Sequence, residues 1–555
     1  MRQLGTLLLF VAAAAGMAVS CTANTPDNLD SVDHEAEAGA PPVGENAGSD
    51  AGSDVDAGSD VDAGSDDSGA CSTATTCQQQ GANCGSIDDG CGGRLDCGSC
   101  TAPDTCGGGG TPSVCGCTPT TCANLGFDCG SVSDGCGGQL DCGAGCVRPQ
   151  TCGSVTPNVC SVPSSCTNLC LKQVDCPNGG TTTVSGKVYA PNGVDPLFNA
   201  LVYVPNAPVD PLPTTISCDT CGAQATGSPL VSTVTAVDGS FTLEDVPVGT
   251  NIPLVIQIGR WRRQIVMPTV AACQNTIVSA ASTHMPKNKS EGDIPRMAFA
   301  TGSLDSLECV MRKIGIDDAE VTTPSNGGRV HLYTGSGSPG ANAGPGTPTQ
   351  TTLVDSPSTL ASYDMVFFPC QGSPYDQTTA RKQNIINYAN AGGRVFASHY
   401  SYVWLYNVAP FSGTAQWDVE KNILESTQTG YIDTSFPKGL ALAQWLQIVG
   451  ASTTLGQIPL YELRSDVQSV NPPSRPWIRI NDSTYGSLPV HFTFNTPVGT
   501  PAAQQCGRVA FQDFHVENFP GSGTFPAACQ PGAMTPQEKL LEFMIFDLAS
   551  CIAPE

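Results

Sequence analysis

Strand-like and helix-like segments alternate along the C-terminal half of the chain. Runs with strand character lie at 297–300, 329–333, 363–368, 394–397 and 507–511, and segments with helical character lie at 303–314, 378–390 and 535–548. This alternation predicts an α/β domain over residues 290–555, built on a flavodoxin-like parallel sheet with helices on its faces. A functional site is expected at the carboxyl ends of the strands.

A second pattern, of short strands separated by turns, fills residues 162–285. Its β-branched and apolar runs lie at 181–189, 200–204, 231–237, 240–243, 252–258 and 264–266. The series predicts an all-β sandwich. Arg260-Trp261-Arg262-Arg263 is a basic, aromatic cluster within it that could bind an anion or an acidic partner. An edge-strand surface explains the cluster equally well.

The first twenty residues, 1–20, predict an export signal. Arg2 supplies a positive start, and Leu4–Val19 is an apolar run too short and too rich in alanine for a membrane span. The run ends in Ala18-Val19-Ser20-Cys21, which resembles a lipobox, where the cysteine is lipidated and becomes the new N-terminus. Because Thr22 rather than aspartate follows, lipidation predicts a lipoprotein of the outer membrane or cell surface. Cleavage without lipidation would leave a periplasmic or secreted protein.

Acidic residues are concentrated just after this cysteine. The chain has a formal net charge of −26, and residues 22–70 hold thirteen Asp or Glu and no Lys or Arg. Their repeated Asp-Ala-Gly-Ser-Asp-Val pattern has no apolar face and repels itself, so residues 21–70 are expected to form an extended tether. The acidic balance argues against nucleic acid as a partner, because phosphate binding needs Lys and Arg.

Sixteen cysteines form the most regular pattern in the sequence. Residues 71–115 contain Cys71, Cys77, Cys84, Cys91, Cys97, Cys100, Cys106 and Cys115, and residues 116–160 contain Cys117, Cys122, Cys129, Cys136, Cys142, Cys146, Cys152 and Cys160. Each member of the second set lies 45 or 46 residues after its counterpart. Modules this small and this poor in large apolar side chains need covalent staples, so disulfides are expected, in one of about a hundred connectivities per module. Zinc is the alternative, which irregular spacing and the absence of histidine disfavour. A rigid stalk is the expected role.

The cysteine count connects the lipid anchor to the rest of the chain. Of 28 cysteines, lipidation of Cys21 leaves 27, the repeats use 16, and 11 remain. An odd remainder requires a free thiol or an intermolecular bridge. Cys218 and Cys221 form a C-x-x-C in a proline-bounded loop without a following helix, so a structural role is expected.

The region 162–285 resembles the carboxypeptidase regulatory-like family, a transthyretin-like β-sandwich. The resemblance rests on Gly186-Lys187-Val188, on the hairpin Asp238–Leu243 and on Val246–Gly249. It implies an accessory or spacer domain without catalytic residues.

The C-terminal domain resembles the class I glutamine amidotransferase-like fold, in its trehalose-utilisation-type branch. Tyr363–Phe368 matches the strand before the first site loop, Gly393–His399 the strand that leads into the nucleophile elbow, and Gly507–His515 the late strand that delivers a histidine. His399 stands where amidotransferases carry their cysteine, so glutamine hydrolysis through a thioester lacks its nucleophile. The whole architecture is similar to that of Cys-rich-repeat lipoproteins of Gram-negative bacteria.

His399 and His515 are the leading candidates for a site at the sheet edge. Asp513 alternates with His515 along its strand and so shares its face. These residues could act as acid and base, and the two histidines could bind a metal. Alternatively, they are remnants of an amidotransferase site, each satisfied by hydrogen bonds. Cys370 is a candidate nucleophile, although a disulfide to a neighbour such as Cys309 is the favoured expectation.

Aromatic residues follow the elbow directly. Tyr400, Tyr402 and Trp404 are expected to form a wall that would suit a sugar ring or another flat ligand.

Three functions fit the sequence. The favoured one is a surface lipoprotein that recognises a glycan or a protein and catalyses nothing. The second is a hydrolase that uses His399 and His515, with or without a divalent metal, on a carbohydrate-related substrate. The third is a cell-envelope spacer. No cofactor is predicted beyond such a metal, and a tryptophan synthase-type lyase is not supported, because the chain lacks eight strand–helix units.

Overall fold

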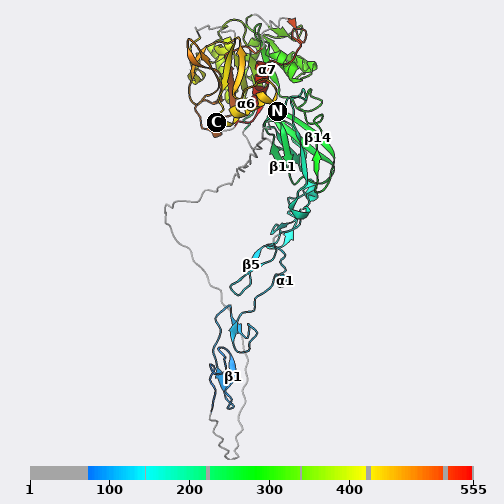
Figure 1. Cartoon of the computed structure of the whole chain (residues 1–555), viewed down its shortest axis with the longest axis vertical. Helices are drawn as coiled ribbons and strands as arrows, with labels where there is room; N and C mark the ends of the chain where they lie inside the picture. The colour runs from blue at the N-terminus through cyan, green and yellow to red at the C-terminus, as the bar shows by residue number, and fades with distance from the viewer. Residues whose placement is uncertain are drawn as a thin grey trace, which may run out of the picture. The chain divides into compact units, whose positions relative to one another are not determined.

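The computed structural model describes residues 73–143, 145–219, 225–337, 340–419, 427–516 and 523–552. Every element described below belongs to one unit of the chain, which begins at Thr75 (Figure 1). None of the helices in the described ranges is long and apolar enough to cross a membrane. The predicted signal peptide, Cys21 and the tether lie outside the described residues.

Small hairpins make up residues 73–161. The paired strands are β1 (Ser86–Asp88) with β2 (Arg94–Asp96), β3 (Thr105–Cys106) with β4 (Cys115–Gly116), β5 (Ser131–Ser133) with β6 (Gln139–Asp141), and β7 (Thr151–Cys152) with β8 (Cys160–Ser161), and α1 (Cys122–Leu125) is a single turn. One carboxylate oxygen of Asp89 accepts two backbone N–H bonds in the first hairpin turn, and Asp134 does the same in the second repeat. The buried apolar side chains in the described part of the repeats are Ala82, Cys84 and Cys129. Disulfides therefore replace a core here.

The disulfide connectivity repeats between the two modules. The second module contains Cys117–Cys136, Cys122–Cys142, Cys129–Cys152 and Cys146–Cys160, and the first contains Cys77–Cys97, Cys84–Cys106 and Cys100–Cys115, the equivalents of the last three. Cys91 is also disulfide-bonded, and Cys71 lies outside the described residues. Disulfides rather than zinc sites are confirmed for the repeat cysteines that the structure describes. Disulfides in this number indicate an exported protein.

Two facing sheets follow, built from strands close to those predicted. The strands are β9 (Thr183–Lys187), β10 (Leu201–Pro205), β11 (Pro229–Val234), β12 (Ser240–Leu243), β13 (Gly249–Ile258), β14 (Trp261–Val270) and β15 (Asn275–Ile277). They form a four-stranded sheet, β11-β10-β13-β14, and a three-stranded sheet, β12-β9-β15. Val184 and Leu243 of the second sheet pack in one core with Val202 and Ile256 of the first. The family assignment of this region stays a prediction.

A ten-stranded sheet dominates the C-terminal part, in the order β17-β18-β16-β20-β21-β28-β27-β26-β23-β24. Its strands are β16 (Met297–Thr301), β17 (Val321–Thr322), β18 (Val330–Thr334), β20 (Met365–Phe368), β21 (Arg394–Ser398), β23 (Thr427–Ile432), β24 (Gln457–Tyr461), β26 (Arg475–Asp482), β27 (Gly486–Thr496) and β28 (Gly507–Gln512). The strands from β17 to β28 in this order pair in parallel, as predicted. The other four pair antiparallel, so the sheet is mixed and the predicted parallel sheet accounts for only part of it. The name flavodoxin-like stays a prediction.

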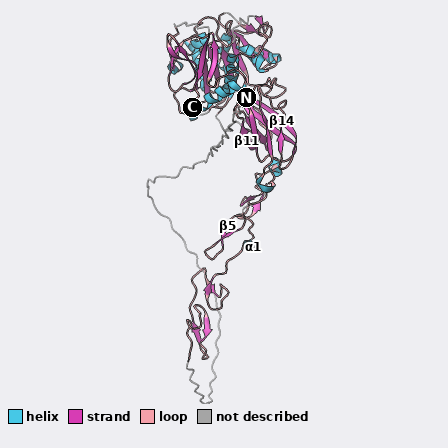
Figure 2. Ribbon diagram, viewed as in Figure 1, coloured by secondary structure: helices cyan, strands magenta, loops and turns pink. Residues whose placement is uncertain are grey.

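Helices cover both faces of the parallel strands, which accordingly carry apolar side chains on both faces (Figure 2). The helices are α2 (Leu307–Ile314), α3 (Gln350–Val354), α4 (Pro357–Leu360), α5 (Thr379–Asn390), α6 (Pro437–Ile448) and α7 (Pro536–Ala549). Phe299 and Phe367 pack with α2, α7 and the sandwich. Ala298 and Phe368 point to the other face and pack with α3, α4 and α5. Helix α6 packs over the antiparallel strands.

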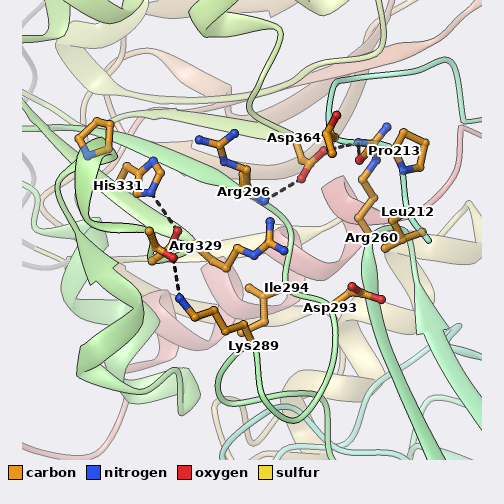
Figure 3. Close-up of a pocket in the computed structure, with 14 residues that line it drawn as sticks. Leu212, Pro213, Arg260, Lys289, Asp293, Ile294, Arg296, Arg329, His331 and Asp364 are labelled. Atoms are coloured by element: carbon orange, nitrogen blue, oxygen red, sulfur yellow. Dashed lines mark hydrogen bonds and ion pairs between the residues drawn. The ribbon is translucent and has the colours of Figure 1, made fainter.

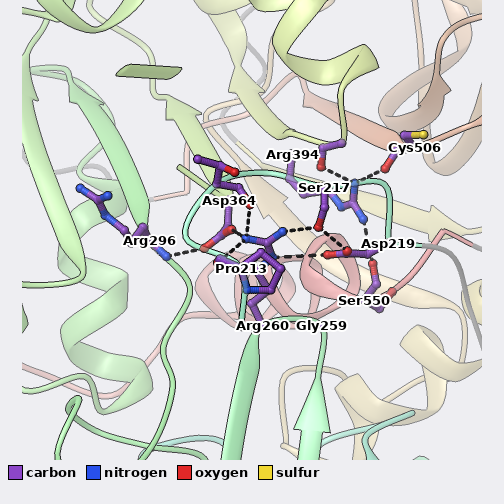
Figure 4. A network of polar contacts seen from close by, with 12 residues as sticks. Pro213, Ser217, Asp219, Gly259, Arg260, Arg296, Asp364, Arg394, Cys506 and Ser550 are labelled. Atoms are coloured by element: carbon purple, nitrogen blue, oxygen red, sulfur yellow. Dashed lines mark hydrogen bonds and ion pairs between the residues drawn. The ribbon is translucent and has the colours of Figure 1, made fainter. Parts of the chain in front are cut away.

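Arginine side chains join the sandwich to the α/β domain. Arg260, in the turn between β13 and β14, forms ion pairs with Asp364 at 2.8 Å and Asp219 at 3.4 Å and donates to Ser217 Oγ at 2.6 Å (Figure 4). Arg262 and Arg263 also pair with carboxylates, those of Asp293 and Glu291. The basic cluster, for which an anion or acidic-partner contact and an edge-strand surface fitted the sequence equally well, is therefore paired with carboxylates of the chain itself.

Two further contacts fix this junction. A disulfide joins Cys218 to Cys506, which confirms a structural role for that member of the C-x-x-C, while Cys221 lies outside the described residues. Gly259 has a φ of +55°, and a Cβ there would lie 1.7 Å from the carbonyl oxygen of Ala549 at the end of α7. The turn therefore needs glycine for both its backbone conformation and its close approach.

Candidate functional site

The candidate site lies at the carboxyl ends of four neighbouring parallel strands. β16, β20, β21 and β28 are adjacent in the sheet, and the segments that follow them contain Asp305, Cys370, His399 and His515. All four side chains are buried. β16 and β20 are also where the strand order reverses, which is the usual position of a site in doubly wound sheets.

His399 occupies a strained turn at the end of β21. The strand ends at Ser398, and His399 begins a short 3-10 helix, His399–Trp404. The φ angle of His399 is 43°, in the left-handed region that non-glycine residues rarely adopt. Strained residues of this kind cluster at functional sites, because the surrounding structure must hold them in place.

Cys370, His399 and His515 converge on one atom. His399 Nδ1 lies 3.2 Å from Cys370 Sγ and 3.2 Å from His515 Nε2. A ring nitrogen offers either one proton or one lone pair, so His399 Nδ1 cannot make two full hydrogen bonds at once. The three donor atoms lie within 4.8 Å of one another. This convergence satisfies hydrogen bonding poorly and suits a shared cation better.

Burial keeps the cysteine and the histidine uncharged. It raises the pKa of the Cys370 thiol to about 12. Burial, with the nearby His515 and Arg464, lowers the pKa of His399 far below its ordinary value. At neutral pH the pair is thus thiol and neutral imidazole, which lacks the thiolate that a cysteine nucleophile needs.

Two carboxylates lie on the far side of His399. His399 Nε2 is 3.8 Å from Asp466 Oδ2, and the backbone N–H of Asp466 donates to Asp513 Oδ2 at 2.6 Å. Burial raises the pKa of both carboxyl groups, and the charge of Asp513 raises that of Asp466 further. Neither carboxylate oxygen of Asp466 has a hydrogen-bond partner among the described residues, and neither has His399 Nε2. Unsatisfied buried polar atoms at one place point to a missing ligand.

Ser398 and Asp305 hold the loops of the site together. Ser398 Oγ donates to Asp305 Oδ2 at 2.6 Å and accepts from the backbone N–H of Cys370 at 3.1 Å. The other oxygen of Asp305 accepts from the backbone N–H of Val516 at 2.9 Å. The segments after β16, β20, β21 and β28 are therefore joined through two side chains.

The structure corrects the expectation for Cys370. Cys309 forms its disulfide with Cys529, and Cys370 is a buried free cysteine. Cys309 lies on α2, whereas Cys370 follows the end of β20 beside His399. The predicted bond between Cys309 and Cys370 is wrong.

The aromatic wall is only partly present. Tyr400 is half-buried, and its ring centroid lies 3.7 Å from that of His399. Trp404 is 1% exposed and stacks on Phe368 at 4.4 Å, so it belongs to the core and cannot stack on a ligand. Tyr402 is also buried.

Asp466 and Asp305 were missed by sequence reasoning. Asp466 lies in a polar loop, Arg464-Ser465-Asp466, that gives no periodicity or motif spacing. Asp305 comes soon after the strand 297–300, and its position at a strand end is the one signal that could have marked it.

The donor set fits a divalent metal such as zinc. One thiolate and two imidazoles are ligands that zinc prefers, and catalytic zinc sites combine three protein ligands with an open position. Donor atoms bound tetrahedrally at about 2.0–2.3 Å lie about 3.3–3.7 Å apart. The two 3.2 Å separations around His399 are close to that spacing. Cys370, His399 and His515 would hold the ion.

Comparisons with known proteins give only weak structural likenesses. No protein-family model matches the sequence, and no curated protein matches it. A solved ThuA-like protein from Bacteroides uniformis is 10% identical to this chain. The match spans 45% of this chain and 90% of that protein, with a TM-score of 0.26. The cytoplasmic protein STM3548 from Salmonella typhimurium is also 10% identical, with 46% and 98% covered and a TM-score of 0.26. Likenesses at these scores carry no argument about fold or function.

Proposed function

We propose that this chain is an exported lipoprotein, held at the outer membrane or cell surface through Cys21, whose C-terminal domain recognises a glycan or a surface protein. Residues 21–70 serve as an acidic tether, and the disulfide-stapled repeats serve as a stalk. The membrane and a glycan or protein are its partners.

The free thiol of Cys370 is the observation that supports the proposed lipidation of Cys21. The chain has an even number of cysteines, 28, and Cys370 forms no disulfide. At least one further cysteine must therefore lack an intramolecular partner. Every other cysteine of the described residues is disulfide-bonded. Of Cys21, Cys71 and Cys221, which lie outside those residues, Cys21 is the one in a lipobox-like sequence.

We expect one free thiol per chain when the mature protein is unfolded without reductant and titrated with a thiol reagent. Lipidation converts the Cys21 thiol to a thioether, so only Cys370 reacts, and the Cys370→Ser variant should give no reaction. The N-terminal peptide should carry the mass of its acyl chains. Two thiols per chain, or an unmodified Cys21 in that peptide, would contradict the anchor.

Burial of the two histidines disfavours catalysis on a sugar at this site. Tyr400 and Ser401 line a cavity of about 10 Å³, whose lining includes neither His399, His515 nor Cys370. A cavity of this size holds about one water molecule. A sugar could not reach the two histidines through it.

A metal-assisted hydrolase acting on a carbohydrate-related substrate is the second candidate. It is favoured by the convergence of Cys370, His399 and His515 and by the unsatisfied Asp466 carboxylate beside them. When bound, a divalent metal would supply an activated water for hydrolysis. Cys370, His399 and His515 would hold it, and an oxygen of Asp466 would be placed to accept a hydrogen bond from His399 Nε2.

Metal analysis separates the two candidates. For the hydrolase we expect about one zinc per purified chain, lost in His399→Ala, because removing one of three protein ligands leaves too few donors. His284→Ala is the matched control, since His284 hydrogen-bonds the backbone of Met285 and lies outside the donor set. Wild-type protein without stoichiometric metal, with glycan binding unchanged in His399→Ala, would exclude the hydrolase.

A further inference from the structure

A cavity lies at the opposite, amino-terminal edge of the parallel strands, where the α/β domain meets the sandwich. Its volume is about 320 Å³, and Figure 3 shows the side chains around it. Arg296 immediately precedes β16, Arg329 precedes β18 and Asp364 precedes β20. The volume is at the lower end of the range for small-molecule sites.

Positive charge is concentrated in this cavity. Arg260, Lys289, Arg296 and Arg329 line it, against the two carboxylates of Asp293 and Asp364. Four of the chain's 24 basic residues thus surround one cavity on a protein of net charge −26. Such a local reversal of sign concentrates anions from solution.

Both carboxylates of the cavity already form ion pairs with arginines. Asp364 pairs with Arg260 at 2.8 Å and accepts from the backbone N–H of Arg296 at 2.7 Å. Asp293 pairs with Arg262 at 2.9 Å. The remaining cationic side chains of the lining have no carboxylate partner in the part of the chain that the structure describes.

Two guanidinium groups are left available. Neither Arg296 nor Arg329 forms a side-chain hydrogen bond or ion pair among the described residues, although both are half-buried. Arg296 lies over the ring of Tyr363 at 5.2 Å, which orients its guanidinium. Lys289 Nζ donates to the carbonyl of Gly327 at 2.8 Å and keeps further N–H donors.

His331 also lines the cavity and lies in the same positive field. It is 1% exposed and hydrogen-bonds Tyr363 and the carbonyl of Gly328. Burial, with the charges of Arg296 and Arg329, lowers its pKa to about 4. Both guanidinium groups are therefore close enough to act on one neutral, fully bonded ring.

We propose that this cavity binds a compact organic phosphate of about the size of a sugar phosphate, held by Arg296, Arg329 and Lys289. Four cations and two carboxylates leave a net charge of +2, which matches a phosphate monoester near neutral pH. Guanidinium groups bind phosphate oxygens in a bidentate manner. The cavity exceeds a phosphate group alone, and Leu212, Pro213 and Ile294 offer apolar contact for an organic portion.

Titration calorimetry on the full chain tests the proposal with four probes: glucose 6-phosphate, inorganic phosphate, glucuronate and glucose. We expect glucose 6-phosphate to bind about tenfold or more tightly than glucuronate, inorganic phosphate to compete, and glucose to give no heat. The double variant Arg296→Gln/Arg329→Gln should weaken glucose 6-phosphate binding about a hundredfold. Arg312→Gln is the matched control, because Arg312 is exposed and paired with Asp318 outside the cavity.

Several results would overturn the proposal. They are the absence of heat with wild-type protein, equal binding by wild type and the double variant, or glucuronate binding as tightly as glucose 6-phosphate. If the double variant does not fold, Lys289→Met replaces it, because Lys289 is exposed and its loss leaves the junction intact. That variant should weaken binding about tenfold, and unchanged affinity would again refute the site.

Discussion

Replacing Arg508 by methionine is expected to lower the free energy of unfolding by about 3–5 kcal/mol. Arg508, on β28, is fully buried; its guanidinium pairs with Asp547 on α7 at 3.0 Å and donates to Asn495 at 2.9 Å. Lys438 on α6 reaches the other oxygen of Asp547 at 2.6 Å. Methionine keeps the volume but leaves a buried carboxylate with one cation in place of two.

The stability lost in Arg508→Met should decrease as the pH falls. Burial alone would raise the pKa of Asp547, but Lys438 and Arg508 outweigh it and hold the pKa below its ordinary value. A lowered pKa in the folded state contributes stability above the pKa of the unfolded chain, and that stability is lost as the pH falls. The difference between wild type and Arg508→Met should therefore shrink from pH 7 toward pH 3.

Urea unfolding followed by tryptophan fluorescence measures this difference, because all five tryptophans lie between Trp261 and Trp477. Arg312→Met is the matched control. Its ion pair with Asp318 is about 40% exposed on both sides, so its loss should change stability by less than about 1 kcal/mol. Equal effects of the two substitutions would show that the buried triad adds no stability.

The parallel half of the sheet was predictable because its signals are local. Met365–Phe368 and Arg394–Ser398 are buried on both faces, so each is a nearly continuous apolar run in the sequence. Two helix starts were equally clear, whereas the helix predicted from 303 begins at Leu307 instead. Thr378 and Thr535 accept N-cap hydrogen bonds from their own first turns, and Thr535 forms a capping box with Glu538.

The antiparallel half was not predictable in the same way. β27 contains His491 and Asn495, which are buried only because neighbouring strands and helices cover them. Polar residues and Pro489 within a strand weaken its sequence signal. The pairing that buries them depends on contacts distant in the chain.

The site shows the same division. His399 and His515 follow apolar strands directly, so their positions could be inferred from the sequence. Asp466 reaches the site because the segment before it pairs with the segment after β28. Leu463 forms an isolated antiparallel β-bridge with Phe514, and the backbone N–H of Arg464 donates to the carbonyl oxygen of Asp513 at 2.7 Å. That approach depends on the antiparallel strands, so it could not be inferred before them. The partner of Cys309 was also mistaken, because spacing along the chain does not reveal which side of the sheet a cysteine lies on.

Replacing Glu542 by glutamine is expected to stabilise the protein at pH 8 by about 4 kcal/mol and to leave it nearly unchanged at pH 4.5. Glu542, on α7, is fully buried, and one of its carboxylate oxygens has no hydrogen-bond partner among the described residues. Burial and the charge of Asp195 raise its pKa to about 8, against the opposing effect of Lys539.

The sign follows from proton binding. A pKa raised in the folded state means that the folded protein keeps a proton which the unfolded chain releases at lower pH. Stability is complete below the ordinary pKa of 4.5 and is lost as the pH rises toward 8, by about 1.4 kcal/mol per pH unit. Glutamine resembles the protonated acid and removes this loss.

Unfolding midpoints at pH 4.5, 6 and 8 test the expectation, with Glu244→Gln as the exposed control of the same chemistry. The unfolding midpoint of Glu542→Gln should change less with pH than that of the wild type. The midpoint of Glu244→Gln should change with pH as the wild-type midpoint does. Because Lys539 pairs with both Asp195 of the sandwich region and Glu542 of α7, the proton on Glu542 decides how strongly this lysine holds the two parts together. A wild-type slope in Glu542→Gln would mean that Lys539 keeps Glu542 ionised throughout, and that the junction is insensitive to pH.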